Sequence, residues 1–218
     1  MKRILFGSFL TLSCAIYAVC SAAASCDTDQ PPRLADHKRV KAKFNGDTLS
    51  FSVPSRFEPV DQERTRAISN DISQLQAWVA PATQAGYPSE MIELRSLRSM
   101  PGSPDPTSVS RLAALHAKMY MSSCPQSFSF GTLPALMRDT PGDETYAVVL
   151  ACGDVRIASP RRSDISVTYV LRGAHDFYVM TWSALAEPRD KAFEIDRNEW
   201  MQRVVSLFPL TVCPVAIN

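Results

Sequence analysis

The sequence predicts an α+β fold, in which two main helices pack on an antiparallel sheet of about six to eight strands. Three observations predict it. Segments of alternating apolar and polar residues occur in two adjacent pairs, each joined by a short turn typical of a hairpin. Two other stretches carry the three- and four-residue apolar spacing of a helix. Runs of strands interrupted by isolated helices are typical of α+β domains.

The first residues have the layout of a secretory signal peptide. Met1, Lys2 and Arg3 precede the uncharged stretch ILFGSFLTLSCAIYAVC and then SAAAS, which is the order of a basic, an apolar and a small-residue region. The alternative is a membrane anchor, but the apolar stretch is short for a span and no basic flank directly follows it. We therefore expect residues 1–24 to be removed at an Ala-x-Ala site and the mature protein to be periplasmic.

Cys26 leaves a second mode of cleavage open. A lipoprotein peptidase would make Cys26 the new N-terminus, although AASC is a weak match to its site. Cys14 and Cys20 leave with the leader in either case, so four of the six cysteines remain. Four can pair completely in an oxidising compartment, whereas lipidation of Cys26 would leave one thiol unpaired. The count favours the soluble form.

Four cysteines allow three pairings, and we expect Cys124–Cys152 and Cys26–Cys213. Cys124 closes the first predicted helix, and Cys152 lies late in a strand that this helix should cover. Cys26 and Cys213 lie near the two ends of the mature chain, and the termini of a domain are often close together.

The domain is predicted to begin with a hairpin. Residues 25–36 should form an extended lead-in, and residues 37–218 a single domain. Alternating residues before and after Asn45-Gly46 predict two strands joined by a tight turn, because that turn requires a positive φ that Asn and Gly tolerate. The lysines of the first strand are expected to be solvated and to block edge pairing. Pro54 ends the second strand.

The stretch from 61 to 80 is compatible with two structures. Ile68, Ile72, Leu75 and Val79 have helical spacing, but LQAWVAP is typical of a strand. We favour a strand near 73–79, then a proline-bearing loop. The alternation in MIELRSLRS predicts another strand at 91–99.

Two amphipathic helices are predicted. The first is capped by Asp105 or Thr107 and runs to Ser123, and its predicted buried stripe is Val109, Leu112, Leu115 and Met119. The second begins at an Asp196 N-cap, with Glu199 three residues later completing a capping box. Four further strands are expected between them, at 127–133, 145–152, 165–172 and 176–184, the last two forming a second hairpin.

A family resemblance follows from several short motifs. They are LSFSVPSRF in the second strand, CPQSF after the first helix, Cys152 late in a central strand and Cys213 near the end. In these the chain resembles small exported proteobacterial proteins of unknown function with a PsbP/Mog1-like sandwich fold, over roughly residues 44–214. The resemblance implies a binding, assembly or chaperone module, and it brings no catalytic residues.

Charge and motifs exclude several classes of function. The leader takes Lys2 and Arg3 and no acid, so the formal net charge falls from +1 to −1, which gives no electrostatic footprint for nucleic acid. The sequence holds no H-E-x-x-H, C-x-x-C, G-x-S-x-G or phosphate-binding glycine loop. We therefore expect no catalytic residues, cofactor or metal. The histidines are expected to be solvated (His37), half-buried (His116) and in a turn (His175), and Trp78, Trp182 and Trp200 to lie in the core.

One long loop is predicted at 153–164, GDVRIASPRRSD, between two strands. Exposed loops of this length are often functional. Arg161 and Arg162 are therefore our candidates for contact with a partner.

Three functions are compatible with these observations. The first is a periplasmic, non-catalytic protein that binds another envelope protein or a small ligand. The second is an inhibitor or immunity protein against an envelope-acting enzyme, which a neighbouring toxin gene would indicate. The third is a hydrolase with an unrecognised site, which would need a deep polar cleft.

The first testable prediction concerns the leader. We expect the exported protein to begin at Ser25, or within one or two residues of it, and to carry no lipid, because the Ala-x-Ala site matches better than the lipoprotein site. The intact mass of the exported form measures this. A diacylglyceryl adduct on Cys26 would contradict the prediction.

Overall fold

The fold is described from a computed structural model. It covers residues 34–44, 47–61, 73–82, 88–98, 108–124, 127–133, 145–156, 161–173 and 176–214, together with residues 32, 63, 65, 69 and 158. The predicted leader, most of the lead-in and the Asn45-Gly46 turn lie outside these residues.

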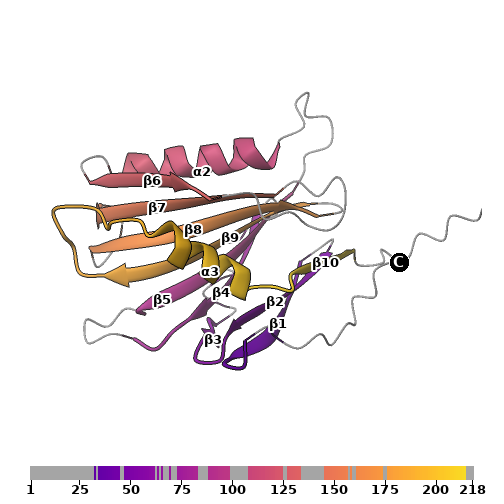
Figure 1. The fold of residues 1–218 in the computed structure, drawn as a ribbon. Coiled ribbons are helices and arrows are strands. Elements are labelled where there is room, and N and C mark those ends of the chain that lie inside the picture. Colours follow the sequence, from indigo (N-terminus) through magenta and orange to yellow (C-terminus); the bar gives the residue numbers. More distant parts are fainter. Residues whose placement is uncertain are drawn as a thin grey trace, which may run out of the picture.

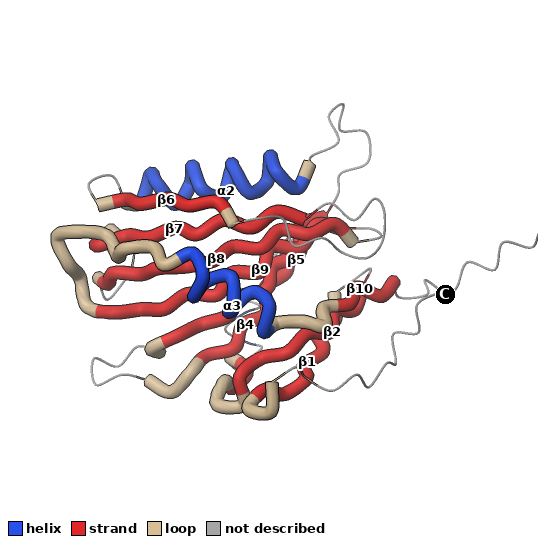
Figure 2. Tube along the Cα trace, in the orientation of Figure 1, coloured by secondary structure: helices blue, strands red, loops and turns tan. Residues whose placement is uncertain are grey.

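Within the described residues, the structure has two antiparallel sheets and the helices α2 and α3 (Figures 1 and 2). A three-stranded sheet has the order β1-β2-β10 and a seven-stranded sheet the order β3-β4-β5-β9-β8-β7-β6. The small sheet consists of β1 (His37–Lys43), β2 (Asp47–Pro54) and β10 (Thr211–Pro214). The large sheet consists of β3 (Glu58–Pro59), β4 (Ser73–Val79), β5 (Glu90–Arg98), β6 (Phe128–Thr132), β7 (Thr145–Val155), β8 (Arg162–Arg172) and β9 (Asp176–Ala186). The helices are α2 (Val109–Ser123) and α3 (Arg197–Ser206). The predicted α+β class is confirmed.

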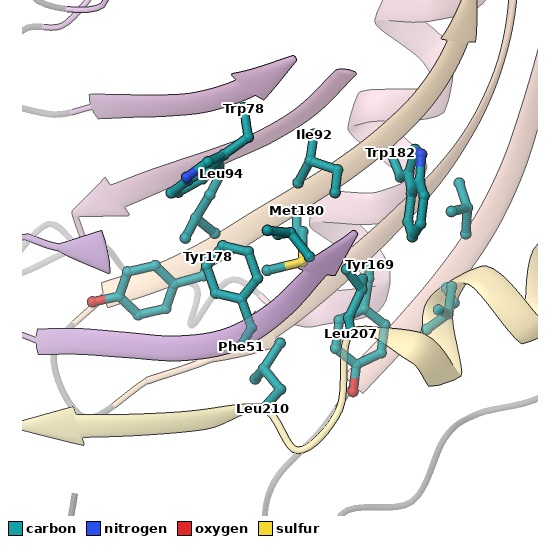
Figure 3. Close-up of a cluster of buried hydrophobic side chains, with 14 of the residues drawn as sticks. Phe51, Trp78, Ile92, Leu94, Tyr169, Tyr178, Met180, Trp182, Leu207 and Leu210 are labelled. Atoms are coloured by element: carbon teal, nitrogen blue, oxygen red, sulfur yellow. The ribbon is translucent and has the colours of Figure 1, made fainter. Parts of the chain in front are cut away.

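The larger core lies between one face of the seven-stranded sheet and a layer made of the small sheet and α3. Figure 3 shows how side chains from β2, β4, β5, β8, β9 and the end of α3 converge there. Phe51 of β2 meets Trp78 of β4 edge to face, with ring centroids 5.1 Å apart, a geometry that aromatic pairs favour. The core position predicted for the tryptophans is confirmed, since Trp78, Trp182 and Trp200 are 6, 4 and 2% exposed.

The second helix, α3, begins at the predicted N-cap, but the Glu199 carboxylate accepts a hydrogen bond from Arg203 Nη2 over 3.0 Å instead of completing the predicted capping box. Asp196 is its N-cap and accepts hydrogen bonds from the backbone N–H groups of Asn198 and Glu199, at 2.9 and 3.2 Å. Arg203 then fixes the helix to the sheet. Its guanidinium lies 4.5 Å from the Trp200 ring centroid and 5.4 Å from that of Trp182, and 3.3 Å from the Glu90 carboxylate.

The first helix, α2, covers the opposite face of the large sheet, but its buried stripe differs from the prediction. Val109 and Ala113 are buried against β7, β8 and β9, whereas Leu115 and Met119 are 53 and 65% exposed. Leu112, Ala117 and Tyr120 pack partly buried against the same cluster, so Val109 and Leu112 of the predicted stripe are confirmed and Leu115 and Met119 are not. The N-cap is Ser108, not Asp105 or Thr107.

Other segments confirm or correct the prediction. Residues 73–79 form a strand, as favoured, and the strands predicted at 91–99 and between the helices are present. The loop predicted at 153–164 is wrong, because β7 continues to Val155 and β8 begins at Arg162, with an irregular register between Cys152 and Val155. Strands β3 and β10 were not predicted. Each is short, and β10 is defined only by pairing with the distant β2.

The predicted Cys124–Cys152 disulfide is confirmed. It joins the C-cap of α2 to β7, with the two Cα atoms 5.9 Å apart, and both cysteines are at most 1% exposed. Cys213 is also disulfide-bonded. Its predicted partner Cys26 lies outside the described residues, so that pairing stays a prediction.

A buried hydrogen bond joins the small sheet to the large one. The Tyr178 hydroxyl of β9 donates to Asp47 Oδ2 of β2 over 2.7 Å, and Asp47 is fully buried. Burial and this hydrogen bond raise the pKa of Tyr178 well above its usual range. Gly173 packs directly against Tyr178 and Asp47. A Cβ at this position would come within 2.5 Å of the Tyr178 ring and 2.6 Å of Asp47 Oδ2.

The close approach at Gly153 generates a second prediction. A Cβ at this position would lie 2.5 Å from the Arg189 carbonyl oxygen and 2.7 Å from that of Lys191. Backbone atoms cannot move aside as a flexible side chain can, so we expect Gly153→Ala to destabilise the protein by about 1–3 kcal/mol. Thermal or urea unfolding measures the loss.

Gly131→Ala is the matched control. It lies in the neighbouring strand β6, where the nearest atom to a new Cβ is Ile195 Cγ2 at 3.6 Å, an ordinary contact. We expect little loss or a slight gain in stability, because glycine weakens a strand interior. Equal losses in the two variants would mean that the 189–191 segment does not pack on Gly153.

Candidate functional site

The two candidate arginines lie in different surroundings. Arg161 is exposed and pairs with Asp154, its Nε lying 3.1 Å from Asp154 Oδ1, and this hydrogen bond holds the pKa of Asp154 below its usual range. Arg162 begins β8 and is half-buried. The structure therefore brings only Arg162 to a cluster of charged residues inside the fold. Contact of either arginine with a partner stays a prediction.

The histidines give one correction. His116 is half-buried on α2, as predicted. The expectation that His37 is solvated is wrong, because its side chain is 6% exposed and its Nδ1 lies 2.8 Å from Asp36 Oδ1. His175 lies outside the described residues.

A cluster of charged side chains occupies the α2-covered side of the large sheet. We call it the charged face, and it consists of Glu93 and Arg95 of β5, His116 of α2, and Arg162 and Asp164 of β8. Alternate residues of a strand share a face, and the register places Glu93 opposite Thr181, which itself lies opposite Thr168. Thr168 shares its side of β8 with Arg162 and Asp164. Glu93 and Arg95 of β5 therefore lie on the same face of the sheet as these two residues.

Small side chains with hydroxyl groups lie between these charged residues on the same face of the sheet. The Oγ1 atoms of Thr168 and Thr181 lie 3.2 Å apart across β8 and β9. One step along the strands, Ser166 lies opposite Ser183 in the register. All four are buried. The middle of this face is therefore polar and buried, unlike the apolar part beneath α2.

Burial shifts the titration of three groups in the charged face. It raises the pKa of Asp164 to about 7, with the nearby Glu93 charge adding to the shift. It also raises the pKa of Glu93, although Arg95 and Arg162 oppose the change. Burial, reinforced by the charge of Arg95, lowers the pKa of His116. Near neutral pH, Asp164 thus exists partly as a carboxylic acid that can donate as well as accept a hydrogen bond.

Three buried polar atoms of this region have unused hydrogen-bonding capacity. They are Asp164 Oδ1, Ser166 Oγ and Arg162 Nε, none of which has a hydrogen-bond partner among the described residues. Asp164 is 7% and Ser166 1% exposed. Unsatisfied buried polar atoms are costly, and other described residues outside this face, such as Asp47 and Arg39, have them too.

Two of the exposed apolar residues of α2, Leu115 and Met119, lie next to the charged face. Residues three and four apart share one side of a helix, so Leu115, His116 and Met119 lie on one flank. His116 is near enough to Arg95 of β5 for that charge to shift its pKa. This flank, defined by Leu115 and Met119, therefore borders the charged face while exposing 53 and 65% of its two apolar side chains.

Sequence reasoning missed Glu93 and Asp164. Glu93 and Arg95 alternate with Ile92 and Leu94, and that pattern predicts a solvent-facing side for the charged residues. Asp164 was assigned to the loop that proved to be part of β8. The available signal was the run of Asp, Ser and Thr at every second residue of β8, which marks one polar face.

Metal ligands and membrane spans are both missing from the described residues. They contain no group of three or more His, Cys, Asp or Glu side chains placed to hold a metal ion. In the same part of the chain, no helix is both long and apolar enough to span a bilayer.

Comparison with known proteins gives structural similarities only. No protein-family model and no curated protein matches the sequence. Among solved structures, the fold is similar to the Ran-binding protein Mog1p of Saccharomyces cerevisiae and to a point mutant of the protein Mog1. Each has a TM-score of 0.42 and 12% identity, over 79% of this chain and 85% of the other. These are Mog1 proteins, as in the PsbP/Mog1-like resemblance, but a similarity of this level carries no function over to this chain.

The buried Asp164 generates a third prediction, of a pH dependence. Its pKa is about 7 in the folded protein against an ordinary 3.8, so the folded state keeps this proton to a higher pH than the unfolded chain. Raising the pH from about 4 to 8 should therefore remove stability through Asp164, by up to roughly 4 kcal/mol. Asp164→Asn cannot ionise, so the free energy of unfolding of wild type relative to this variant should fall over that range.

Asp190→Asn provides the control, because Asp190 is an exposed carboxylate. Its stability should follow that of wild type at each pH, measured by urea unfolding at five values between about 4 and 8. Parallel curves for wild type and Asp164→Asn would contradict the prediction and mean that Asp164 is solvated.

Proposed function

We propose that this protein is an exported, non-catalytic binding protein of the periplasm, and that its partner is another protein of the cell envelope. The partner contacts the α2 flank that carries Leu115 and Met119. The observation that carries the proposal is the exposure of these two side chains, 53 and 65%, beside the charged face.

The compartment rests on the leader and the cysteines. A basic, apolar and small-residue sequence at the N-terminus is typical of an exported chain. The buried Cys124–Cys152 disulfide supports the same compartment, since such bonds form and persist in oxidising surroundings. The absence of catalytic sequence motifs supports a binding role rather than a hydrolase.

The α2 flank has the composition of a protein-binding surface. Leu115 and Met119 are one helical turn apart and place their apolar side chains in water. Methionine adapts its shape to a partner because its side chain is unbranched and polarisable. Charged residues bordering an apolar centre are the usual arrangement of an interface, in which the centre supplies affinity and the charges supply orientation.

Capture by the purified mature protein tests the proposal. Wild type should retain one envelope protein from a detergent extract of the encoding organism's envelope, and Leu115→Lys and Met119→Lys should reduce its recovery by about tenfold or more. A lysine in the apolar centre of an interface loses the buried contact and adds a charge without a partner. Mass spectrometry quantifies the retained protein.

Ala114→Lys is the matched control on the same helix. Ala114 is exposed and lies outside the flank, so this variant introduces the same side chain without touching the apolar pair. It should retain the partner at the wild-type level. Equal recovery with all four proteins, or no enriched protein with wild type, would refute the proposal, provided that the melting temperatures agree.

A further inference from the structure

Strand β6 forms an edge of the large sheet and lacks the protection of the other described edge strands (Figure 1). The other edges are β1, β3 and β10. Strand β1 carries three lysines and an arginine, and the short strands β3 and β10 each contain a proline. Charges, prolines and short length all discourage pairing with another chain. Strand β6, FSFGT, has neither a charge nor a proline, and its Phe130 is 51% exposed.

Alternate residues of β6 turn their backbone groups away from β7. The Gly153 N–H donates to the Ser127 carbonyl oxygen, and the Leu133 N–H donates to the Ala147 carbonyl oxygen, each over 3.2 Å. Hydrogen-bonded and non-hydrogen-bonded pairs alternate along antiparallel strands. Residues 129 and 131 therefore also bond to β7, whereas the N–H and C=O groups of residues 128, 130 and 132 point outward.

This outward edge is accessible. The backbone groups of residues 128, 130 and 132 make no hydrogen bond to any other described residue. Phe130 and Thr132 are both exposed, so a further strand can approach them. An exposed row of unpaired backbone groups is a template for the addition of a strand.

Apolar side chains border the same edge on the α2 side of the sheet. Phe130 faces this side, because its register partner Leu150 packs in the cluster beneath α2. The ring centroids of Tyr120 on α2 and Phe128 on β6 are 6.0 Å apart, so the end of the helix reaches the edge strand. Met121, which follows Tyr120, is 48% exposed.

We propose that β6 pairs with β6 of a second copy of this chain, antiparallel and about a two-fold axis at Phe130, so that the two large sheets become one. In this register Phe130 of one copy lies opposite Phe130 of the other, and Phe128 lies opposite Thr132. All outward N–H and C=O groups of both strands then bond to one another, which no register shifted along the strand achieves. Such a self-complementary contact is the usual form of a dimer interface.

The side chains at this seam suit a second copy of the same strand. Because β6 is uncharged, two copies do not repel each other. The two Phe130 side chains meet with their Cβ atoms about 5 Å apart, and each is thereby removed from water. On the opposite face the small residues Ser129 and Gly131 lie across from each other. Arg197 lies beside Gly131, but it is exposed, so its charge stays in water.

Sedimentation equilibrium of the oxidised mature protein tests the proposal. Wild type should form dimers at a protein concentration of about 100 μM. Phe130→Lys and Phe130→Glu should each raise the dissociation constant of the dimer about tenfold or more, because like charges then lie directly opposite each other. An equimolar mixture of the two variants should dimerise more tightly than either alone, since opposite charges then meet across the axis.

Leu115→Lys is the control, because Leu115 is exposed on the α2 flank and away from the seam. It should leave the dissociation constant unchanged, so that the dimer and capture through the α2 flank are tested separately. Thr132→Pro removes an outward N–H and keeps the bonds to β7, so it should weaken the dimer while the protein stays folded by circular dichroism.

Three results would overturn the proposal. They are a wild type that stays monomeric at this concentration, a dimer that Phe130→Lys or Thr132→Pro leaves intact, and a mixture of the two charge variants that associates no better than each variant alone.

Discussion

The hairpin of β8 and β9 is buried on both of its faces, and the rest of the structure is arranged to cover it. Residues 163–171 of β8 and 176–183 of β9 are all buried. Odd residues of β8 such as Tyr169 and even residues of β9 such as Tyr178 enter the core shared with the small sheet and α3, and the alternate residues face α2. One layer alone would leave half of this hairpin in water, so the small sheet, α3 and α2 are all required.

Local patterns predicted the elements whose form depends on neighbours in sequence. The Asp196 cap and the β8–β9 hairpin each follow from a few nearby residues, and the Cys124–Cys152 bond follows from the position of a cysteine at the end of the helix and another in the strand it covers. The α2 stripe did not, because Leu115 and Met119 fit an apolar helix face equally well whether or not a sheet lies beneath them. The charged face was not predicted from the sequence for a similar reason. Asp164 lies among polar residues typical of a loop, yet it is 7% exposed, and Glu93, whose charge adds to its pKa shift, lies on β5, which is remote in sequence.

The α2 flank and a pocket at β4 differ in the side chains that they expose. The α2 flank exposes apolar side chains beside charges that the fold has partly desolvated, so its contacts suit a broad protein surface. The pocket at β4 has a volume of about 460 Å³, and Lys43 is the charged residue among its described lining residues. They depend on different elements, since α2 packs on β7 and β8 whereas the pocket is built from β1, β3 and β4.

The position of β10 has a consequence for how the chain is made. This strand lies against β2, so the small sheet joins the second strand of the fold to the last one, as Figure 1 shows by the yellow arrow beside the indigo pair. Until residues 211–214 leave the ribosome, β2 keeps an open edge along Asp47–Ser50. An open edge of this kind is a template for pairing with another chain. A chain cut before Thr211, which loses β10, should therefore yield aggregates rather than a slightly shorter protein.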